Sequence, residues 1–310
     1  MLPTYTKTKT FWLIILVLIF VFVYFLRQVF LGNIILSQAF SIGPLTIHYY
    51  GIVMAIAAAS GFYLAIKRAP QYGISLKIAE DLLFWIIIGG FVGARLYHVI
   101  TSYPYYLANP ADILKVWNGG LSIFGALIGG VVTLMVYIRL QTTNYKLLTL
   151  LDWLTPSLLL GQIIGRFGNL FNYEAFGYPS NLPWKMFVPL QFRPSQYIQF
   201  NFFQPFFLYE VLANAIILFL LLKLSAIQRS KSDFAKASSD FAPANAGSGK
   251  LFFYYLLLYN SVRFCLEFLR TDSTFIGNFR VNAIVSLVLL ALAILGIIYT
   301  QHKGKHAEIP

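Results

Sequence analysis

Charged residues are scarce in this chain of 310 residues, at 11%, whereas 58% of the residues are hydrophobic. A soluble domain would be nearer a quarter charged, so the composition excludes an ordinary soluble protein and indicates a polytopic membrane protein. Acidic residues are fewer than basic residues, with 11 Asp and Glu against 23 Lys and Arg. The basic residues form no stripe and are scattered between apolar runs, which favours membrane topology over nucleic-acid binding.

Cysteine is nearly absent as well. Cys265 stands alone within an apolar segment, which excludes a disulfide framework and a thiolate metal site. Histidine is rare, and His48 and His98 have no partner at a metal-ligand spacing, so we expect no metal and no cofactor. The sequence contains no P-loop, dinucleotide fingerprint or Ser-His-Asp order. No lipobox-like cysteine follows the first apolar run, so we do not expect the chain to be a lipoprotein itself.

Long apolar runs are abundant and predict an all-α fold of about eight transmembrane helices, because a spanning helix needs about 20 mostly apolar residues. We expect these helices near residues 11–31, 48–66, 82–100, 120–138, 148–165, 206–223, 251–269 and 281–299. Lys7 and Lys9 precede a first run that is long and aromatic, so residues 1–34 are interpreted as an uncleaved membrane anchor. Asp152 and Pro156 interrupt the helix near 148–165.

The basic residues also predict the topology. With the N-terminus inside, the cytoplasmic segments carry about twice as many Lys and Arg as the outer ones, which predicts that both termini are cytoplasmic. Residues 35–300 would form the membrane domain, with 166–205 as a long outer loop able to form a small extracytoplasmic cap. Residues 225–249 are small and polar and contain Ser-Asp-Phe-Ala twice, which predicts a flexible cytoplasmic insertion. Residues 301–310 would be a cytoplasmic tail.

Ionisable side chains within membrane spans are costly and are candidates for function. The stretch "YNSVRFCLEFLR" places four of its polar side chains on one helical face: Tyr259, Arg263, Glu267 and Arg270. This face either neutralises its own charge through an Arg263–Glu267 pair or binds an anion, for which arginine is the natural fork. Both interpretations stay open on this stretch alone.

A second stretch, "IIGRFGNLFNYEAFG" (163–177), places four polar side chains directly after an apolar run: Arg166, Asn169, Asn172 and Glu174. Arg166 either snorkels to lipid headgroups from a helix end or binds phosphate together with the Arg263 face. Glycines near Arg166 allow close backbone approach and favour the second interpretation.

Four further polar residues are weaker candidates: Tyr50, Arg95, Asp152 and Glu210. Tyr50 is either an interfacial aromatic or a substrate contact. Arg95 lies in a helix of small residues, where structural charge pairing and ligand contact are both open. Glu210 either pairs with an arginine or acts in the site. Asp152 lies near the inner end of its helix, away from the outer group.

Together these motifs resemble bacterial prolipoprotein diacylglyceryl transferase from about Ser41 to Thr300. The resemblance is carried by "SIGPLTIHYYG", "GGFVGARLYHVI", "GGLSIFGALIGG", "LDWLTPSLLLGQIIGRFGNLFNYEAFG", "PFFLYE" and "LYNSVRFCLEFLRTD", in the family's order. The block G-R-x-G-N-x-x-N-x-E, which begins at Gly165, is the most specific signature. The extra N-terminal helix and the 225–249 insertion lie outside the usual seven-helix core.

The resemblance implies a transferase in the bacterial cytoplasmic membrane whose active site faces the extracytoplasmic side. It would transfer diacylglyceryl from phosphatidylglycerol to the lipobox cysteine of a prolipoprotein signal peptide, forming a thioether and releasing glycerol phosphate. Its partners would be these two substrates and membrane lipids, without nucleic acid or cofactor. The implied catalytic residues are Arg166, Arg263, Glu267, Tyr259 and Glu174. The implied lipid-binding residues are Arg166, Asn169, Asn172, Tyr50 and Arg263. The implied supporting residues are Asp152, Arg95, Glu210 and Arg270.

Two departures from the family pattern matter. Phe124 stands where the family often has His or Tyr, so this position supplies no base, and Glu267, Glu174 or the substrate phosphate remain open. Gln204 replaces the histidine of the H-P-x-x-L-Y-E pattern. A lipid transporter or flippase is the alternative from another class, although it would place charges near the midplane and show related halves. A catalytically impaired relative that only binds phospholipid is a third interpretation.

Overall fold

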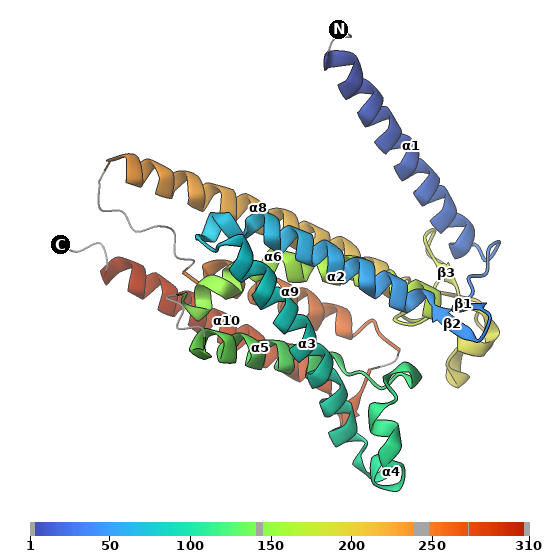
Figure 1. The fold of residues 1–310 in the computed structure, drawn as a ribbon. Helices are drawn as coiled ribbons and strands as arrows, with labels where there is room; N and C mark the ends of the chain where they lie inside the picture. The colour runs from blue at the N-terminus through green and yellow to red at the C-terminus, as the bar shows by residue number, and fades with distance from the viewer. Residues whose placement is uncertain (1–3, 141–144, 239–247, 272, 307–310) are drawn as a thin grey trace. The chain divides into compact units, whose positions relative to one another are not determined.

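The computed structural model describes residues 4–140, 145–238, 248–271 and 273–306, and its regular structure is mainly helical (Figure 1). The eight expected helices are present as α1 Thr4–Phe30, α2 Tyr49–Arg68, α3 Leu76–Thr101, α5 Ile123–Leu140, α6 Leu147–Gly165, α8 Phe206–Ser238, α9 Lys250–Glu267 and α10 Val281–His306. Two short helices, α4 Tyr103–Ala108 and α7 Gly168–Asn172, lie between them. The prediction of an all-α polytopic fold is confirmed.

Within the described residues, seven helices are long and apolar enough to cross a membrane: α1, α2, α3, α5, α6, α8 and α10. On α1, Leu16 is 62% exposed and Phe20 is 72% exposed, as expected of a helix surrounded by lipid. The protein is therefore a multi-pass membrane protein with an additional N-terminal helix. α9 is not among the seven because its 18 residues include Lys250, Arg263 and Glu267. That α9 also spans the membrane stays a prediction.

One predicted helix end was wrong. α8 was expected to end near residue 223, before a flexible insertion, but it continues to Ser238. The sequence from Ser225 to Ser238 contains no Gly or Pro, and its three Ala, two Lys and one Arg are good helix formers, so nothing in it breaks the helix. Residues 239–247 of the expected insertion lie outside the described residues.

α6 remains continuous through the two residues that seemed to interrupt it. Pro156 has no N–H, so the carbonyl of Asp152, four residues earlier, loses its usual helical partner. The hydroxyl of Tyr72 donates to this carbonyl at 3.4 Å. A side chain from another segment therefore replaces the hydrogen bond that proline removes.

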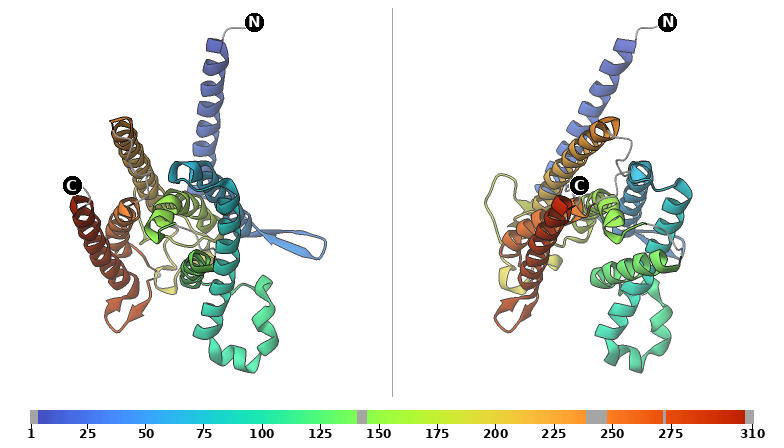
Figure 2. Two further views of the ribbon diagram at one scale, coloured as in Figure 1. Left: turned by 60° about the vertical axis from the view of Figure 1, so that its left-hand side comes forward. Right: turned by 90° about the vertical axis from the view of Figure 1, so that its left-hand side faces the viewer.

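Within the part of the chain that the structure describes, three short antiparallel pairs of strands accompany the helices. β1 Ala39–Ile42 and β2 Leu45–His48 form the hairpin that Figure 2 shows as a separate ribbon, joined by Gly43 and Pro44. β5 Phe275–Ile276 and β6 Phe279–Arg280 are joined by Gly277 and Asn278. Both glycines have positive φ, as a two-residue hairpin turn requires. Neither hairpin was predicted from the sequence, although each carries the Gly-X turn signal.

The chain divides into two compact units. The first unit comprises residues 1–57, 161–216 and 259–290, and the second comprises 58–160, 217–258 and 291–310. In the first unit, the segment 166–205 is folded around buried Val188 and Phe203 and contains the pair β3 Met186–Phe187 and β4 Phe202–Phe203. The last turn of α1 packs into the same core through Val29, which is 1% exposed.

In the second unit, α3 and α5 pack closely through small residues. Gly89 and Gly93 of α3 face Gly125 and Gly129 of α5 so closely that an added Cβ would meet the opposite backbone. Such small-residue faces are typical of helix contacts in membranes. The chain between these helices contains α4 and two 3-10 turns, Pro110–Leu114 and Val116–Asn118, and forms the loop beyond the end of α3 in Figure 2.

Candidate active site

Four charged side chains of the first unit form an alternating chain of ion pairs. The Nε atom of Arg166 lies 2.9 Å from Oε2 of Glu210. The other oxygen of Glu210 lies 2.9 Å from Nη1 of Arg263, whose Nη2 lies 3.0 Å from Oε2 of Glu267. The structure thus brings together the two stretches that the sequence analysis singled out, and Glu210 joins them.

These ion pairs are largely removed from solvent. The side chains of Glu210 and Glu267 are 5% and 0% exposed, that of Arg263 is 13% exposed, and that of Arg166 is 26% exposed. A buried charge is tolerated only when it is paired, so the alternation of sign is a condition for burying this cluster. Arg166, at the more open end of the chain, is the member that a ligand can reach most easily.

Glu267 is held by more than its arginine. The side-chain amide of Asn282 donates to Oε1 of Glu267 at 3.2 Å, so both carboxylate oxygens have a polar neighbour. The guanidinium of Arg280 donates to the main-chain carbonyl of Glu267 and to the hydroxyl of Ser273 at 2.9 Å. Glu267 is therefore a fixed and fully buried counter-charge for Arg263.

The prediction that Arg270 continues the face of Arg263 and Glu267 was wrong, because α9 ends at Glu267. The N–H of Arg270 bonds to the carbonyl of Glu267 three residues earlier, and Arg270 then forms a β-bridge with Gly177. Its guanidinium nevertheless lies 5.3 Å from the ring centroid of Phe206, which Arg263 approaches to 6.0 Å. Two arginines therefore contact one aromatic ring. Tyr259, one turn before Arg263 on α9, is half-buried.

The signature block after α6 folds tightly. The carbonyl of Asn169, a residue 8% exposed, accepts from the N–H of Glu174 at 3.0 Å. The side-chain amide of Asn172 donates to the exposed carboxylate of Glu174 at 3.2 Å. Tyr173 takes a left-handed backbone conformation with φ 52°, and its hydroxyl accepts from the N–H of Leu36 at 2.7 Å. Burial raises the pKa of Tyr173, so this hydroxyl stays protonated at neutral pH.

Tyr50 lies against this block. A Cβ on Gly168 would lie 2.8 Å from the Cδ2 atom of the Tyr50 ring, so only glycine lets the ring approach the backbone so closely. Tyr50 also lies near enough to Glu174 and Arg166 to interact electrostatically with their charges. α2, which supplies Tyr50, thereby contacts the segment after α6 that carries Arg166.

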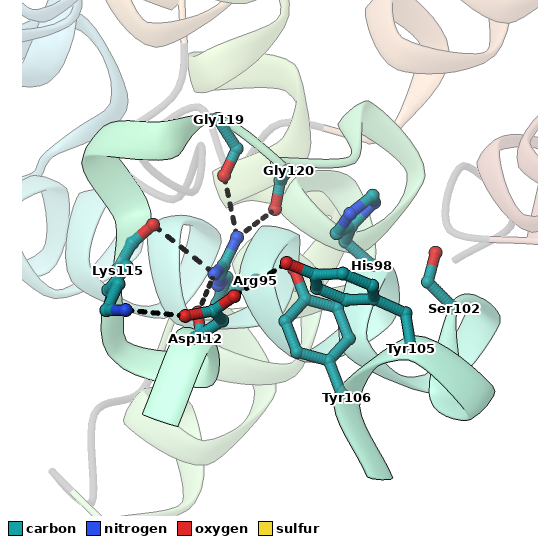
Figure 3. A pocket seen from close by; sticks show the side chains of 9 residues that line it. All are labelled: Arg95, His98, Ser102, Tyr105, Tyr106, Asp112, Lys115, Gly119 and Gly120. Atoms are coloured by element: carbon teal, nitrogen blue, oxygen red, sulfur yellow. Dashed lines mark hydrogen bonds and ion pairs between the residues drawn. The ribbon is translucent and has the colours of Figure 1, made fainter. Parts of the chain in front are cut away.

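Arg95 belongs to the second unit, where it organises a loop. Its guanidinium donates to the main-chain carbonyls of Asp112, Lys115, Gly119 and Gly120, at distances of 2.5–3.5 Å (Figure 3). It also donates to the carbonyl of Ile113 at 2.9 Å. Arg95 is 7% exposed, and a Cβ on Gly120 would lie 2.6 Å from its Nη1 atom. The sequence predicted a charge pair or a ligand contact for Arg95, and in the structure its guanidinium donates to carbonyl oxygens.

The loop around Arg95 borders a partly open polar pocket of about 310 Å³ that His98, Ser102 and Tyr105 also line (Figure 3). Hydrogen bonds from Lys115 and Tyr105 hold the pKa of Asp112 below its ordinary value. The same contact with Asp112 raises the pKa of Tyr105. Phe124, where the family often has a base, is 43% exposed and lies beside Tyr97 with ring centroids 6.3 Å apart.

Asp152, also in the second unit, binds the beginning of α9. Its two carboxylate oxygens accept from the N–H groups of Gly249 and Phe252, each at 2.8 Å. A carboxylate at a helix N-terminus satisfies free N–H groups and interacts favourably with the helix dipole. This geometry gives Asp152 a capping role. Among the described residues, no three His, Cys, Asp or Glu side chains lie together as a metal site would require.

Sequence reasoning underestimated Glu210 and missed Asn282, Arg280 and Phe206. Glu210 was named as a supporting residue that could pair with an arginine, and the structure shows that it pairs with both Arg166 and Arg263. An acidic residue at the start of an apolar span, with arginines at the ends of two others, was the available signal.

Comparison with known proteins agrees with the motif resemblance. The family described as prolipoprotein diacylglyceryl transferase matches residues 37–299. A relative from Thermotoga maritima is 40% identical over 286 residues, which cover 91% of this chain and 92% of the relative. One from Synechococcus elongatus is 40% identical over 83% of this chain and 85% of the relative, and one from Fervidobacterium nodosum is 36% identical over 86% of each. All three are named phosphatidylglycerol–prolipoprotein diacylglyceryl transferase.

Proposed function

Since the chain belongs to the prolipoprotein diacylglyceryl transferase family, we propose that it transfers the diacylglyceryl group of phosphatidylglycerol to the lipobox cysteine of a prolipoprotein signal peptide. The observation that carries this proposal is the ion-pair chain that places Arg166 and Arg263 on one carboxylate, Glu210. Two guanidiniums held so close together suit a phosphate group.

In the proposed step, the cysteine sulfur attacks the glyceryl carbon that carries the phosphate. A carbon–sulfur bond forms, the carbon–oxygen bond breaks, and its electron pair leaves on the phosphate oxygen, so the products are a thioether and glycerol phosphate. Arg166 and Arg263 stabilise the charge that develops on the leaving phosphate. Arg166 uses Nε for Glu210, and among the described residues its terminal nitrogens show no other partner, so they are free to contact phosphate.

The acceptor thiol has an ordinary pKa near 8.5 and must lose its proton before or during the attack. Of the two carboxylates that the sequence left open, Glu267 is the poorer base because it is fully buried and paired on both oxygens. The carboxylate of Glu174 is exposed, and among the described residues Asn172 is the side chain that donates to it. We therefore propose that Glu174 either accepts the thiol proton or helps to position Tyr50, which lies near its charge. Asn169 and Tyr259 orient the headgroup in this scheme.

We also propose the cellular setting. The protein would lie in the bacterial cytoplasmic membrane with both termini inside, and the site of Arg166 would face the extracytoplasmic side, where secreted prolipoproteins emerge. Residues 1–34 would anchor the chain, residues 35–300 would form the transferase domain, and the folded segment 166–205 would be its outer cap. The two-to-one distribution of Lys and Arg supports this orientation.

Transfer assays test the proposal directly. Purified protein is mixed with phosphatidylglycerol and a lipobox peptide, and mass spectrometry follows the addition of diacylglyceryl to the peptide. We expect addition with the Cys peptide and none with its Cys→Ser form. Arg166→Ala and Arg263→Ala should each lose at least about 100-fold in rate, as the removal of an oxyanion-stabilising donor does. Arg27→Ala, an exposed arginine at the end of α1, is the matched control. Transfer at the wild-type rate by both site variants would refute the assignment.

A further inference from the structure

One helical turn from the ion-pair chain, α6, α8 and α9 carry a second set of polar side chains, which are uncharged and which we call the carboxamide layer. The carboxamides are Gln162 on α6, Asn214 on α8 and Asn260 on α9. Each lies one helical turn from a charged member of the chain, on the side toward the middle of its helix. Gln162 precedes Arg166 by four residues, Asn214 follows Glu210 by four, and Asn260 precedes Arg263 by three. All lie in the first unit.

Asn214 indicates that this layer does more than fill space in the core. It belongs to the buried stripe of α8, which repeats at helical spacing through Phe207, Glu210, Ile217 and Leu221. Asn214 is 2% exposed, yet among the described residues its Nδ2 atom has no hydrogen-bond partner. A buried donor without an acceptor is costly, whereas an apolar side chain of similar size at this position would not be.

The depth of the layer matches the chemistry of a phospholipid. Four residues of α-helix span about 6 Å. The interfacial region on each side of a bilayer, from the phosphate to the hydrocarbon boundary, is also roughly 5–8 Å thick. A lipid whose phosphate meets Arg166 and Arg263 therefore brings its two ester groups to the level of the carboxamides. Ester carbonyls are neutral acceptors without donors, and the NH₂ of Asn supplies donors without charge.

We infer that the carboxamide layer binds the ester carbonyl oxygens of the lipid donor, with Nδ2 of Asn214 as a donor. This inference rests on the proposed function and adds a basis for substrate selection. The arginines recognise a phosphate whatever lipid carries it, and the carboxamides distinguish a diacyl glycerolipid from a dialkyl ether lipid. Both lipids have the same headgroup and similar chains, but the ether lipid lacks carbonyl oxygens.

The test compares transfer from phosphatidylglycerol and from its dialkyl ether analogue of equal chain length, using wild-type protein and Asn214→Leu. We expect wild type to prefer the diester in kcat/KM. Asn214→Leu should lose about tenfold in kcat/KM on the diester and little on the ether, so the preference shrinks. The difference in intrinsic reactivity of the two lipids is the same for both proteins and cancels in the ratio of preferences.

Three outcomes overturn the inference. The first is a wild-type protein that uses the ester and the ether lipid equally well. This measurement needs no variant, so it tests the inference even if Asn214→Leu fails to fold. An unchanged preference in Asn214→Leu, whether both rates fall or neither does, makes Asn214 a residue of structure alone. If wild type transfers neither lipid to a lipobox peptide, the proposed function fails and this inference falls with it. Asn181→Leu, an exposed asparagine in the 166–205 segment, is the matched control.

Discussion

Replacing Glu210 by glutamine tests whether the ion-pair chain is held together at its centre. The substitution keeps the size of the side chain and one acceptor oxygen, but it removes the negative charge that Arg166 and Arg263 share. The two mostly buried arginines would then have one carboxylate left in the cluster, that of Glu267, which pairs with Arg263. Breaking a buried pair typically costs 3–5 kcal/mol, and because Gln retains an acceptor we expect about 3 kcal/mol.

The measurement is thermal unfolding of purified protein in lipid nanodiscs. A loss of about 3 kcal/mol predicts a decrease in Tm of roughly 6–12 °C, using 2–4 °C per kcal/mol for a large domain. Asp112→Asn is the control, because it breaks the pair with Lys115, whose side chains are 23% and 44% exposed, so the pair should contribute much less than the buried one. Adding Arg166→Gln to the Glu210 variant should recover part of the loss, since one unneutralised cation disappears. A Tm of Glu210→Gln equal to that of wild type, or to that of Asp112→Asn, would refute the reasoning.

Three other substitutions probe the surroundings of the site. Gly168→Ala should displace the Tyr50 ring and raise KM for phosphatidylglycerol severalfold. The control is Gly161→Ala, whose Cβ would lie 3.6 Å from its nearest neighbour and should leave KM unchanged. Equal KM values for the two variants would contradict the proposed contact. Asp152→Asn should lower stability by about 1 kcal/mol through the weakened cap of α9, seen as a lower Tm with unchanged KM. Arg95→Lys supplies three donors in place of a planar fork, so faster amide hydrogen exchange over residues 112–120 is expected, and protection equal to wild type would count against the clamp.

Much of the fold follows from composition and hydropathy alone. Helices that must cross hydrocarbon have to be long and apolar, so the ranges of α2, α3 and α10 are visible in the sequence before any contact is known. The end of α8 was not visible in this way, because Ser225–Ser238 is too polar to count as a span and yet contains nothing that breaks a helix. Hydropathy reports the membrane and not the limit of helical structure.

The candidate site was predictable in its membership but not in its pairing. The cost of burying Arg166 and Arg263 marked them as functional, and the structure places both in one cluster. That Glu210 holds both depends on how α8 approaches two other helices, which the spacing of residues along one chain does not contain. Arg270 shows the converse, because extrapolating a helical face beyond the true end of α9 placed it wrongly.

The carbonyl clamp on Arg95 has a consequence for what can open the 112–120 loop. Main-chain carbonyls neither gain nor lose a proton in the physiological range, and an arginine side chain keeps its own. Dissolved salt weakens attractions between exposed charges far more than short contacts inside a buried cage. We therefore expect neither acid nor high ionic strength to break the hydrogen bonds between Arg95 and these carbonyls. A molecule that releases the loop must offer the guanidinium a better acceptor than five peptide oxygens, or pull the chain away by force.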